Sequence, residues 1–312
     1  MESLIVGQLR IALLSPREQA MNIFSVNVED WFHSFNFIEP IKIEQWGNQP
    51  SVVENGFYRI LELLLKYKTR ATFFFLGWVA KKYPHLVKES NENGFEIASH
   101  GFFHQEVYKI SIEELYNDLV SSKKLLEDIS GDPVLGYRAP SFTFTKDTYW
   151  FYPTLIRAGY RYDSSLFLAK RRVGGFSTPN FTPFEISYGG CKLLEFTISM
   201  AKVLKWPFCF FGGGYLRPFP YFIISTMARQ VIKERRPIIV YIHPRELFSL
   251  KVKQRMSLMG RFKHNINVKS TPQKLEKILK RFVLTSFKDY ILRNYGNILE
   301  DPDEDRKKQF RS

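Results

Sequence analysis

Two histidines at close spacing are the residues of this chain that most resemble a metal-binding pair. His100 and His104 follow a short strand-like run at Glu96–Ser99. Neutral imidazole is a ligand well suited to zinc, and two imidazoles four residues apart can point the same way from one helical turn. Two unrelated surface or core histidines are the alternative interpretation, and the pair alone does not separate the two.

An amide and two carboxylates close an earlier strand-like run. Asn27, Glu29 and Asp30 end the segment that begins at Asn22. A carboxylate at this place could complete a site of two histidines and one carboxylate, which leaves one coordination position open for water. A solvated acidic turn is the alternative, and the sequence does not decide between Glu29 and Asp30 as the ligand.

Two further strand-like segments end in residues that could act on a substrate. Arg138 follows residues 135–137 and could hold a carboxylate through two hydrogen bonds. His243 ends the hydrophobic run 238–242, a place where a barrel enzyme carries a general acid. The alternatives are a surface arginine before a turn-forming proline and a hydrogen-bonded core histidine.

These residues can meet only if the strands that they follow lie side by side. Strand-like and helix-like segments alternate, which favours a parallel α/β architecture, and the number of units fits a barrel better than a three-layer sandwich. The active site of such a barrel lies at the carboxyl ends of its strands. Expected strands are 23–28, 71–76, 96–99, 135–137, 193–196 and 238–242, and expected helices are 52–68, 78–92 and 112–129.

Composition and charge limit the class of partner. The chain has 312 residues, 45% of them hydrophobic, and a net charge of +14, which is typical of a globular and not of a disordered protein. Residues 251–299 hold 12 Lys or Arg against two acidic residues. Such a balance indicates a polyanion, an anionic membrane or an acidic substrate. No recognition motif accompanies the charge, so no nucleic-acid partner is expected.

Four parts are expected along the chain. Residues 1–21 are expected to be a disordered N-terminal leader, with Met21 as a hypothetical true start, and 22–250 to form the barrel. Residues 251–299 are expected to be a basic helical extension packed on the barrel, and 300–312 a charged flexible tail.

A cytoplasmic location is expected as well. The first apolar stretch is too short to span a bilayer and makes a poor signal peptide. The two cysteines form no C-x-x-C pair, which argues against a disulfide scaffold or a cysteine zinc site. Contact of the basic extension with anionic lipid at the inner face of the membrane is a further hypothesis.

The motifs together resemble the NodB-homology polysaccharide deacetylases, carbohydrate esterase family 4. The resemblance covers about residues 22–290 and is strongest to the branch associated with exosortase and exopolysaccharide gene clusters. Its landmarks are SVNVEDWFH (25–33), ATFFFLGWVA (71–80), GFEIASHGFFHQ (94–105), GYRAPSF (136–142), GYRYDSSLF (159–167), GGGY (212–215) and YIHPRE (241–246).

The resemblance implies a distorted (β/α) barrel that removes acetyl groups from N-acetylated sugars with one divalent metal, most often Zn²⁺. His100 and His104 match the family's metal histidines, and Glu29 or Asp30 would be the third ligand. Arg138 matches the arginine that positions the catalytic base, and His243 matches the general acid.

Substrate contacts follow from the same resemblance. A backbone N–H near Ser141 or Phe142 would help to hold the oxyanion. Trp31 is a candidate for stacking on a sugar ring, and Tyr215 lies in the glycine- and aromatic-rich region expected to wall the groove. For such aromatic residues, simple core packing is the alternative.

The chain departs from the family pattern at Asn27. The family has an aspartate there as the catalytic base, and an amide cannot accept a proton at neutral pH. Three explanations are open: Glu29 serves as the base while Asp30 binds metal, the protein is a degenerate binder, or Asn27 is an inactivating substitution. The expected function is therefore deacetylation of an N-acetylated polysaccharide or lipid-linked oligosaccharide, with a catalytically inactive carbohydrate-binding protein as the alternative.

Overall fold

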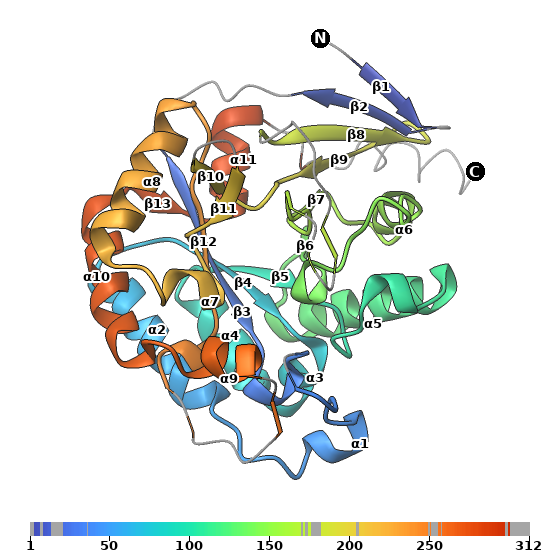
Figure 1. The fold of residues 1–312 in the computed structure, drawn as a ribbon. Coiled ribbons are helices and arrows are strands. Elements are labelled where there is room, and N and C mark those ends of the chain that lie inside the picture. Colours follow the sequence, from blue (N-terminus) through green and yellow to red (C-terminus); the bar gives the residue numbers. More distant parts are fainter. Residues whose placement is uncertain are drawn as a thin grey trace.

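The computed structural model describes residues 3–6, 9–13, 21–35, 37–169, 171, 174–175, 182–203, 206–248, 250, 255–256, 258–296 and 299. Within these residues, one sheet has the strand order β1-β2-β8-β9-β7-β6-β5-β4-β3-β12, and β13 also pairs with β3 (Figure 1). The order has two ends, β1 and β12, so the hydrogen bonds between these strands do not close a complete ring.

Parallel strands form the centre of this sheet and place the site. They are β3 (Asn22–Val28), β4 (Thr72–Phe75), β5 (Glu96–Ser99), β6 (Gly136–Tyr137), β7 (Tyr162–Asp163), β9 (Cys191–Glu195) and β12 (Ile239–Ile242), with β13 (Leu284–Thr285) parallel to the start of β3. Antiparallel pairs extend one edge through β8 (Phe184–Tyr188), β2 (Leu9–Leu13) and β1 (Ser3–Val6).

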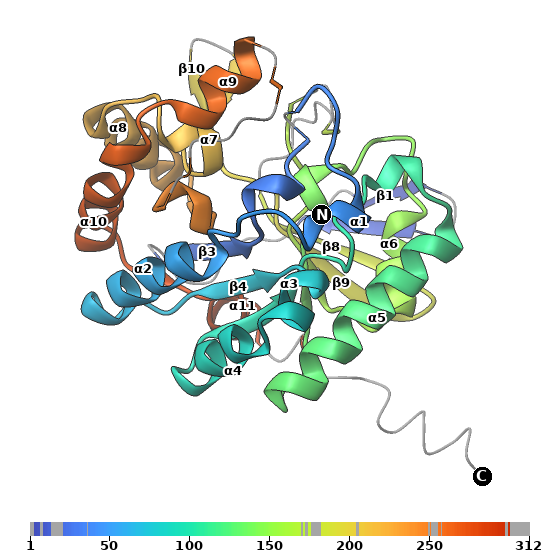
Figure 2. The same ribbon diagram turned by 90° about the horizontal axis from the view of Figure 1, so that it is seen from below.

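Helices surround the parallel strands, as the view along the molecule in Figure 2 shows. The longer helices are α2 (Val53–Lys66), α4 (Pro84–Glu92), α5 (Ile112–Ser130), α8 (Tyr221–Lys233), α10 (Thr271–Arg281) and α11 (Phe287–Tyr295). The shorter ones are α1 (Ile43–Trp46), α3 (Gly77–Lys82), α6 (Phe151–Arg157), α7 (Gly213–Leu216) and α9 (Leu258–Asn265). None of the described helices is long and apolar enough to cross a membrane.

The core explains why β4 carries three consecutive phenylalanines after its first residue, Thr72. Phe73 and Phe75 pack outward against Phe57 of α2, whereas Phe74 faces Tyr162 and Phe287 on the inner side. A strand covered on both faces needs a continuous hydrophobic run, and the prediction for residues 71–76 rests on that run. The three phenylalanines are all fully buried.

Residues 251–299 are more than an extension packed on the barrel. β13 hydrogen-bonds to the first residues of β3, and α11 inserts Phe287, Tyr290 and Ile291 into the inner core. These three residues recur at helical spacing, so they form one apolar face, and burying it completes the interior at the amino-terminal ends of the strands. The sheet and the inner core therefore continue past residue 250.

Two strands lie in the described part of residues 1–21, the segment for which a disordered leader is expected. β1 and β2 form an antiparallel hairpin, and β2 pairs with β8. β8 would otherwise be an edge strand with unpaired backbone groups, which readily accept another strand. Of the remaining expectations, the tail 300–312 lies outside the described residues.

Local signals account for two other differences. The helix expected over 78–92 is two helices, α3 and α4, because Pro84 lacks an N–H and starts a new helix.

The glycine- and proline-rich region 170–220 contains β8 and a separate hairpin of β10 (Met200–Val203) and β11 (Trp206–Cys209), none of which the pattern predicted. The helix 112–129 with its capping box of Ser111 and Glu114 is confirmed as α5.

Candidate active site

Four strand ends carry the predicted site residues to one edge of the sheet. Glu29 follows β3, His100 follows β5, Arg138 follows β6 and His243 follows β12. These strands are parallel and lie within the order β6-β5-β4-β3-β12, so their carboxyl ends lie at the same edge of the sheet. The location that the strand-end argument predicts is the one that the structure has.

Three buried side chains converge as a metal-binding set. One donor atom each of Glu29, His100 and His104 lies within 4.8 Å of the others, and this is the one such group among the described residues. The Glu29 Oε2 atom is 2.6 Å from His104 Nε2 and 3.4 Å from His100 Nε2. Two imidazoles and one carboxylate are a common donor set for catalytic zinc.

A loop, and not a helical turn, brings the second histidine to the first. Gly101 and His104 both adopt positive φ angles, of 74° and 52°, which reverse the chain between the two imidazoles. The Asp118 carboxylate accepts hydrogen bonds from the backbone N–H groups of Phe102, at 2.8 Å, and Phe103, at 3.1 Å. The spacing of four residues therefore points to the pair, but a loop brings the two imidazoles together and not one helical turn.

The protonation states suit metal binding. His100 Nδ1 lies 2.7 Å from the carbonyl oxygen of Arg138, so Nδ1 carries the proton and Nε2 presents its lone pair to the group. Burial lowers the pKa of His100 to about 4, which keeps the ring neutral. Burial raises the pKa of Glu29, but His104, His100 and His243 outweigh burial and hold it well below its usual range.

Unpaired polar atoms show that the residues present fit a cation. Glu29 Oε2 and both ring nitrogens of His104 are buried without a hydrogen bond of acceptable geometry, although Glu29 Oε2 and His104 Nε2 lie only 2.6 Å apart. A buried polar group left unpaired costs about 1–3 kcal/mol, so native proteins rarely keep several in one place without a reason. A divalent cation bound by Glu29, His100 and His104 would satisfy these atoms.

Asp30 is not part of this set. Its Oδ1 atom accepts from the Trp31 N–H at 2.9 Å, and its Oδ2 atom accepts from Ser51 Oγ at 2.5 Å and from the Val52 N–H at 3.1 Å. The carboxylate caps the segments that follow β3, so the alternative in which Asp30 binds metal and Glu29 acts as base is corrected by the structure.

Asn27 lies between the arginine and the first histidine. Its Oδ1 atom accepts a hydrogen bond of 2.8 Å from Arg138 Nη1, and its Nδ2 atom is 3.4 Å from His100 Nε2. Arg138 is fully buried and also donates to Ser25 Oγ at 2.9 Å. Burial lowers the pKa of Arg138 to about 10, so the guanidinium stays charged at neutral pH with an amide where a carboxylate was expected.

Two buried acids lie behind Arg138. Asp163 and Glu195 face each other in the register of β7 and β9, and Ser164 accepts from Arg138 through its carbonyl and hydroxyl oxygens. Burial raises the pKa of Asp163 to about 6, and burial together with Asp163 raises the pKa of Glu195 well above its usual range. The raised pKa of Glu195 favours a state in which the pair holds one proton and carries a single negative charge near Arg138.

A second acid–base unit contains His243. Its Nε2 atom is 3.7 Å from Glu29 Oε1, at the edge of the candidate metal centre. Glu246 accepts from the His243 backbone N–H at 3.1 Å and lies 3.5 Å from its Nδ1 atom, and Arg217 Nε is 3.5 Å from the other oxygen of Glu246. The sequence analysis missed Glu246 and Arg217, although Glu246 stands only three residues after the histidine.

Of the predicted substrate residues, two lie in a strained turn. Ser141 and Phe142 have φ angles of 50° and 55°, which is unusual for residues with side chains. The Phe142 N–H donates to the Ala139 carbonyl at 3.0 Å, so only the Ser141 N–H is a candidate for the oxyanion. Arg171, another residue that the sequence analysis missed, donates to the Ser141 and Phe142 carbonyl oxygens at 2.7 and 3.0 Å.

The other two predicted substrate residues differ in exposure. Trp31 is 5% exposed, donates from Nε1 to the Pro50 carbonyl at 2.8 Å and packs edge-on against Phe32. It is a core residue and cannot stack on a sugar ring, which corrects that expectation. Tyr215 in α7 is partly buried, and its ring lies 5.9 Å from that of Phe167.

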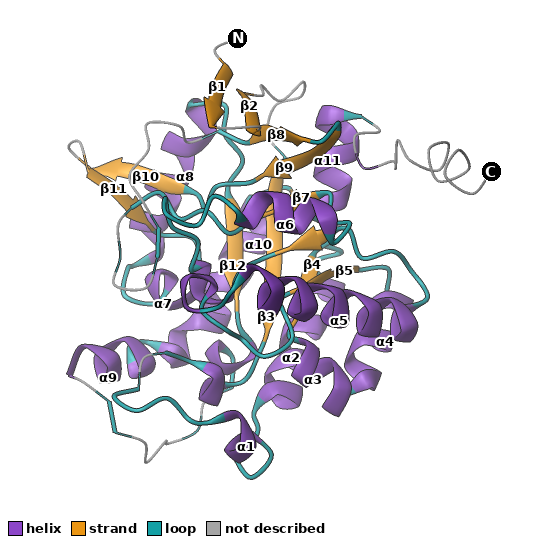
Figure 3. Cartoon of the chain, turned by 90° about the vertical axis from the view of Figure 1, so that its right-hand side faces the viewer, coloured by secondary structure: helices purple, strands orange, loops and turns teal. Residues whose placement is uncertain are grey.

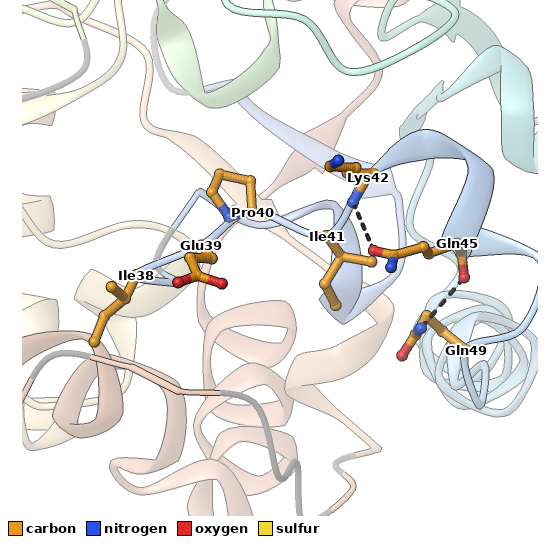
Figure 4. A pocket seen from close by; sticks show the side chains of 7 residues that line it. All are labelled: Ile38, Glu39, Pro40, Ile41, Lys42, Gln45 and Gln49. Atoms are coloured by element: carbon orange, nitrogen blue, oxygen red, sulfur yellow. Dashed lines mark hydrogen bonds between the residues drawn. The ribbon is translucent and has the colours of Figure 1, made fainter.

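A separate surface pocket of about 570 Å³ lies along the loop before and within α1 (Figure 4). Ile38, Glu39, Pro40, Ile41, Lys42, Gln45 and Gln49 line it. Figure 4 shows Gln45 bridging the Lys42 backbone N–H and the Gln49 side chain. None of the predicted site residues lines this pocket, so it carries no part of the chemistry described above.

Comparison with protein families divides the chain in two. Residues 48–162 match the family described as polysaccharide deacetylase, and residues 164–292 match a domain of unknown function, DUF3473. The first match contains His100, His104 and Arg138, and the second contains His243, whereas Asn27 and Glu29 precede both. The second match also runs across residue 250, in agreement with the continuous sheet.

Several curated relatives are named as peptidoglycan deacetylases. The chain is 38% identical over 82 residues to a peptidoglycan-N-acetylglucosamine deacetylase of Bacillus cereus and 28% identical over 136 residues to a peptidoglycan deacetylase of Helicobacter pylori. These matches cover 26% and 44% of this chain, and 38% and 42% of the relatives. The chain thus spans about two fifths of the length of these relatives.

Solved structures confirm the fold class. A Mycobacterium smegmatis structure assigned as a polysaccharide deacetylase aligns with a TM-score of 0.59 and 15% identity, covering 96% of this chain and 94% of that one. The allantoinase PuuE aligns with the same TM-score and 14% identity, covering 88% and 91%. At these identities the similarity shows the fold alone, a distorted (β/α) barrel with a parallel sheet.

Proposed function

We propose that this protein is a metal-dependent hydrolase that removes acetyl groups from an N-acetylated glycan. The observation that carries the proposal is the convergence of Glu29, His100 and His104 at the strand ends, beside Arg138 and His243. The deacetylase match over residues 48–162 and the names of the curated relatives support the same substrate class.

Glu29, His100 and His104 would hold the cation, and their donor set favours Zn²⁺. When bound, such a cation would polarise the acetyl carbonyl and lower the pKa of a coordinated water. The chain's own contribution is to keep His100 neutral and the Glu29 carboxylate ionised. The Arg138 carbonyl fixes the tautomer of His100, so its Nε2 lone pair faces the centre without a change of protonation.

His243 would protonate the leaving amine. An amine is too basic to depart as an anion, so amide hydrolysis needs a general acid within reach of the nitrogen. Glu246 accepts from the His243 backbone N–H and lies 3.5 Å from Nδ1, an arrangement that would orient the imidazole with Nε2 toward Glu29 and the substrate. Arg217 keeps Glu246 in place. The Ser141 N–H would donate to the oxygen of the carbonyl under attack.

Asn27 limits how fast this reaction can run. Its amide oxygen already accepts from Arg138 and cannot take a proton from water. Loss of a general base costs about 10²–10⁴-fold in rate, so the chain should be a slow deacetylase. A catalytically inactive carbohydrate-binding protein on the same fold is the second candidate, and Asn27 is the observation that favours it.

The biological setting is part of the proposal. We propose that the substrate is a polysaccharide or a lipid-linked oligosaccharide of exopolysaccharide or cell-envelope synthesis, processed on the cytoplasmic side. The sequence resemblance to the exopolysaccharide-associated branch supports this setting, and the surface charge is compatible with it.

Acetate release from N-acetylglucosamine oligomers tests the activity. We expect release that requires added zinc, stops with a chelator and is lost in His104→Ala. Calorimetric titration of the same oligomers is the parallel measurement for the second candidate. Tight oligomer binding without any acetate release would contradict the hydrolase and favour the binding protein.

A further inference from the structure

Two long segments of the chain contain no acidic residue. Residues 196–233 hold five Lys or Arg and no Asp or Glu, and residues 247–275 hold seven Lys or Arg and no Asp or Glu. Between and after them, Glu234 pairs with Arg236, Glu246 is buried against Arg217, and Glu276 pairs with Lys66 at 3.0 Å. The elements built from these segments therefore present positive charge without nearby negative charge from their own sequence.

The first segment forms a hairpin with an apolar outer face. Trp206 of β11 is 71% exposed, Phe208 is 45% exposed, and Val203 of β10, opposite Trp206 in the register, is 36% exposed. Residues two apart on one strand point to the same side, so the three side chains share a face. Lys202 on the same hairpin is also exposed.

Aromatic contacts connect this hairpin to the start of α8. The ring of Phe208 is 6.3 Å from that of Phe210, which is 4.9 Å from that of Phe219. Phe222, in the first turn of α8, is 69% exposed. Lys277 of α10 places its Nζ atom 5.6 Å from the ring of Tyr221 and adds a cation beside these aromatic residues.

The second segment adds another apolar and basic projection on the same side. Leu258 and Phe262 of α9 are 86% and 55% exposed, and Arg261 beside them is exposed as well. The hairpin and α9 both project to the left in Figure 3 and to the top in Figure 2. The two views agree that both elements face the same direction.

We propose that this face, made of Val203, Trp206, Phe208, Phe222, Leu258 and Phe262 with the surrounding Lys and Arg, docks on an anionic lipid bilayer. Soluble proteins rarely leave several large apolar side chains together on the surface without a partner. Tryptophan and phenylalanine on a basic background enter the headgroup boundary of membranes, and the lysines and arginines are attracted to acidic lipids.

The proposed lipid-binding face differs from the basic extension, residues 251–299, for which lipid contact is expected from the sequence alone. α10 and α11 turn Leu275, Ile278 and Phe287 into the core, so much of residues 251–299 is occupied by packing. The lipid-binding elements are the hairpin, the start of α8 and α9. The proposal goes beyond the proposed deacetylase function and does not depend on it, because vesicle binding is measured without turnover.

Vesicle sedimentation and Trp206 fluorescence test the proposal on the full chain. The probes are vesicles of phosphatidylcholine alone and with about 30% phosphatidylglycerol. The test variant is Trp206→Ser with Phe208→Ser, and the matched control is Leu65→Ser with Ile112→Ser, which removes two exposed apolar side chains from α2 and α5. Thermal unfolding checks that both variants fold.

We expect wild type and control to bind the anionic vesicles equally, and the test variant to bind at least about tenfold more weakly. Brominated lipid should quench part of the wild-type fluorescence, and that part should vanish in Trp206→Phe. Absence of binding, equal binding by the test variant, or binding without quenching would overturn the proposal. Equal loss of binding to vesicles and to soluble dextran sulfate would overturn it too, because the site would then be one for polyanions.

Discussion

Arg138 Nη1 donates a 2.8 Å hydrogen bond to the side-chain oxygen of Asn27, and the Asn27 nitrogen lies 3.4 Å from His100 Nε2. The amide thus bridges the buried arginine and the candidate metal centre. A carboxylate at position 27 would accept from Arg138 in the same way and leave its second oxygen for a proton. The side chain at position 27 therefore lies where a general base would lie. In Asn27, however, an N–H donor replaces the oxygen atom that would accept the proton.

The change Asn27→Asp should restore the missing base. We expect acetate release to rise about 10²–10⁴-fold, because a general base contributes that much when it is correctly placed. Acetate release and zinc content are measured together. Asn27→Ser is the control, since it removes the amide without adding a base. An unchanged rate in a zinc-loaded Asn27→Asp variant would show that position 27 does not limit the reaction.

The change Glu246→Gln should slow only those reactions in which a general acid must protonate the leaving group. With a poorly oriented His243, deacetylation of the N-acetylated glycan should fall about 10²-fold, since the leaving amine must be protonated. Hydrolysis of 4-nitrophenyl acetate should hardly change, because nitrophenolate leaves without a proton. Both rates are compared in the Asn27→Asp background, with thermal unfolding as the check on folding. A parallel loss of both activities would contradict an orienting role for Glu246.

The pair of Asp163 and Glu195 should make stability depend on pH. Glu195 keeps its proton in the folded protein and loses it in the unfolded one, so stability from this group is full at low pH and falls as pH rises. As pH rises from the usual carboxyl range toward the raised pKa of Glu195, the free energy of unfolding should fall by up to about 1.4 kcal/mol per pH unit through this one proton. Urea unfolding of wild type and Glu195→Gln measures it.

Glu195→Gln is a suitable comparison because an amide reproduces the bonding of a protonated carboxyl. Gln can accept from the Leu166 N–H, as Glu195 does at 2.9 Å, and donate to Asp163. We therefore expect a shallower pH dependence in the variant, with similar stability near pH 5. Parallel curves for the two proteins would mean that Glu195 is ionised in the folded state.

A close contact between α2 and the segment after β12 should be sensitive to one methyl group. A Cβ atom at Gly56 would lie 2.1 Å from the carbonyl oxygen of Pro244, the residue after His243. Gly56→Ala should therefore lower stability by about 1–3 kcal/mol and reduce activity by displacing His243. Gly47→Ala is the matched control, because nothing lies within 4 Å of its Cβ position. Equal stability of the two variants would contradict this contact.

The sequence predicted the parts of the site that depend on strand ends. The largely buried strands β5, β6 and β12 are each followed directly by a polar residue, so the places of His100, Arg138 and His243 could be inferred from pattern. The choice of Glu29 over Asp30 could not, because it depends on which carboxylate caps the following chain. The two carboxylates are adjacent and chemically alike, so the sequence alone does not show which of them binds the metal.

Long-range packing explains the other differences. α11 belongs to the basic segment 251–299, and only the position of β13 beside β3 shows that Phe287 fills the interior. The sequence allows Trp31 to stack on a sugar ring, but its side chain is buried in the short helix that Asp30 caps. Glu246 lies three residues after His243, a spacing that would have indicated a partner if the turn of Pro244–Glu246 had been expected.

Metal content tests the central claim most directly. Zinc per chain is measured by elemental analysis after purification and zinc reconstitution, for wild type, Glu29→Gln, His104→Ala and Asp30→Asn. The arrangement of Glu29, His100 and His104 predicts about one zinc in wild type and in Asp30→Asn, and loss of zinc in the other two variants. No zinc in the wild type, or zinc that is kept in Glu29→Gln and lost in Asp30→Asn, would contradict the metal centre described here.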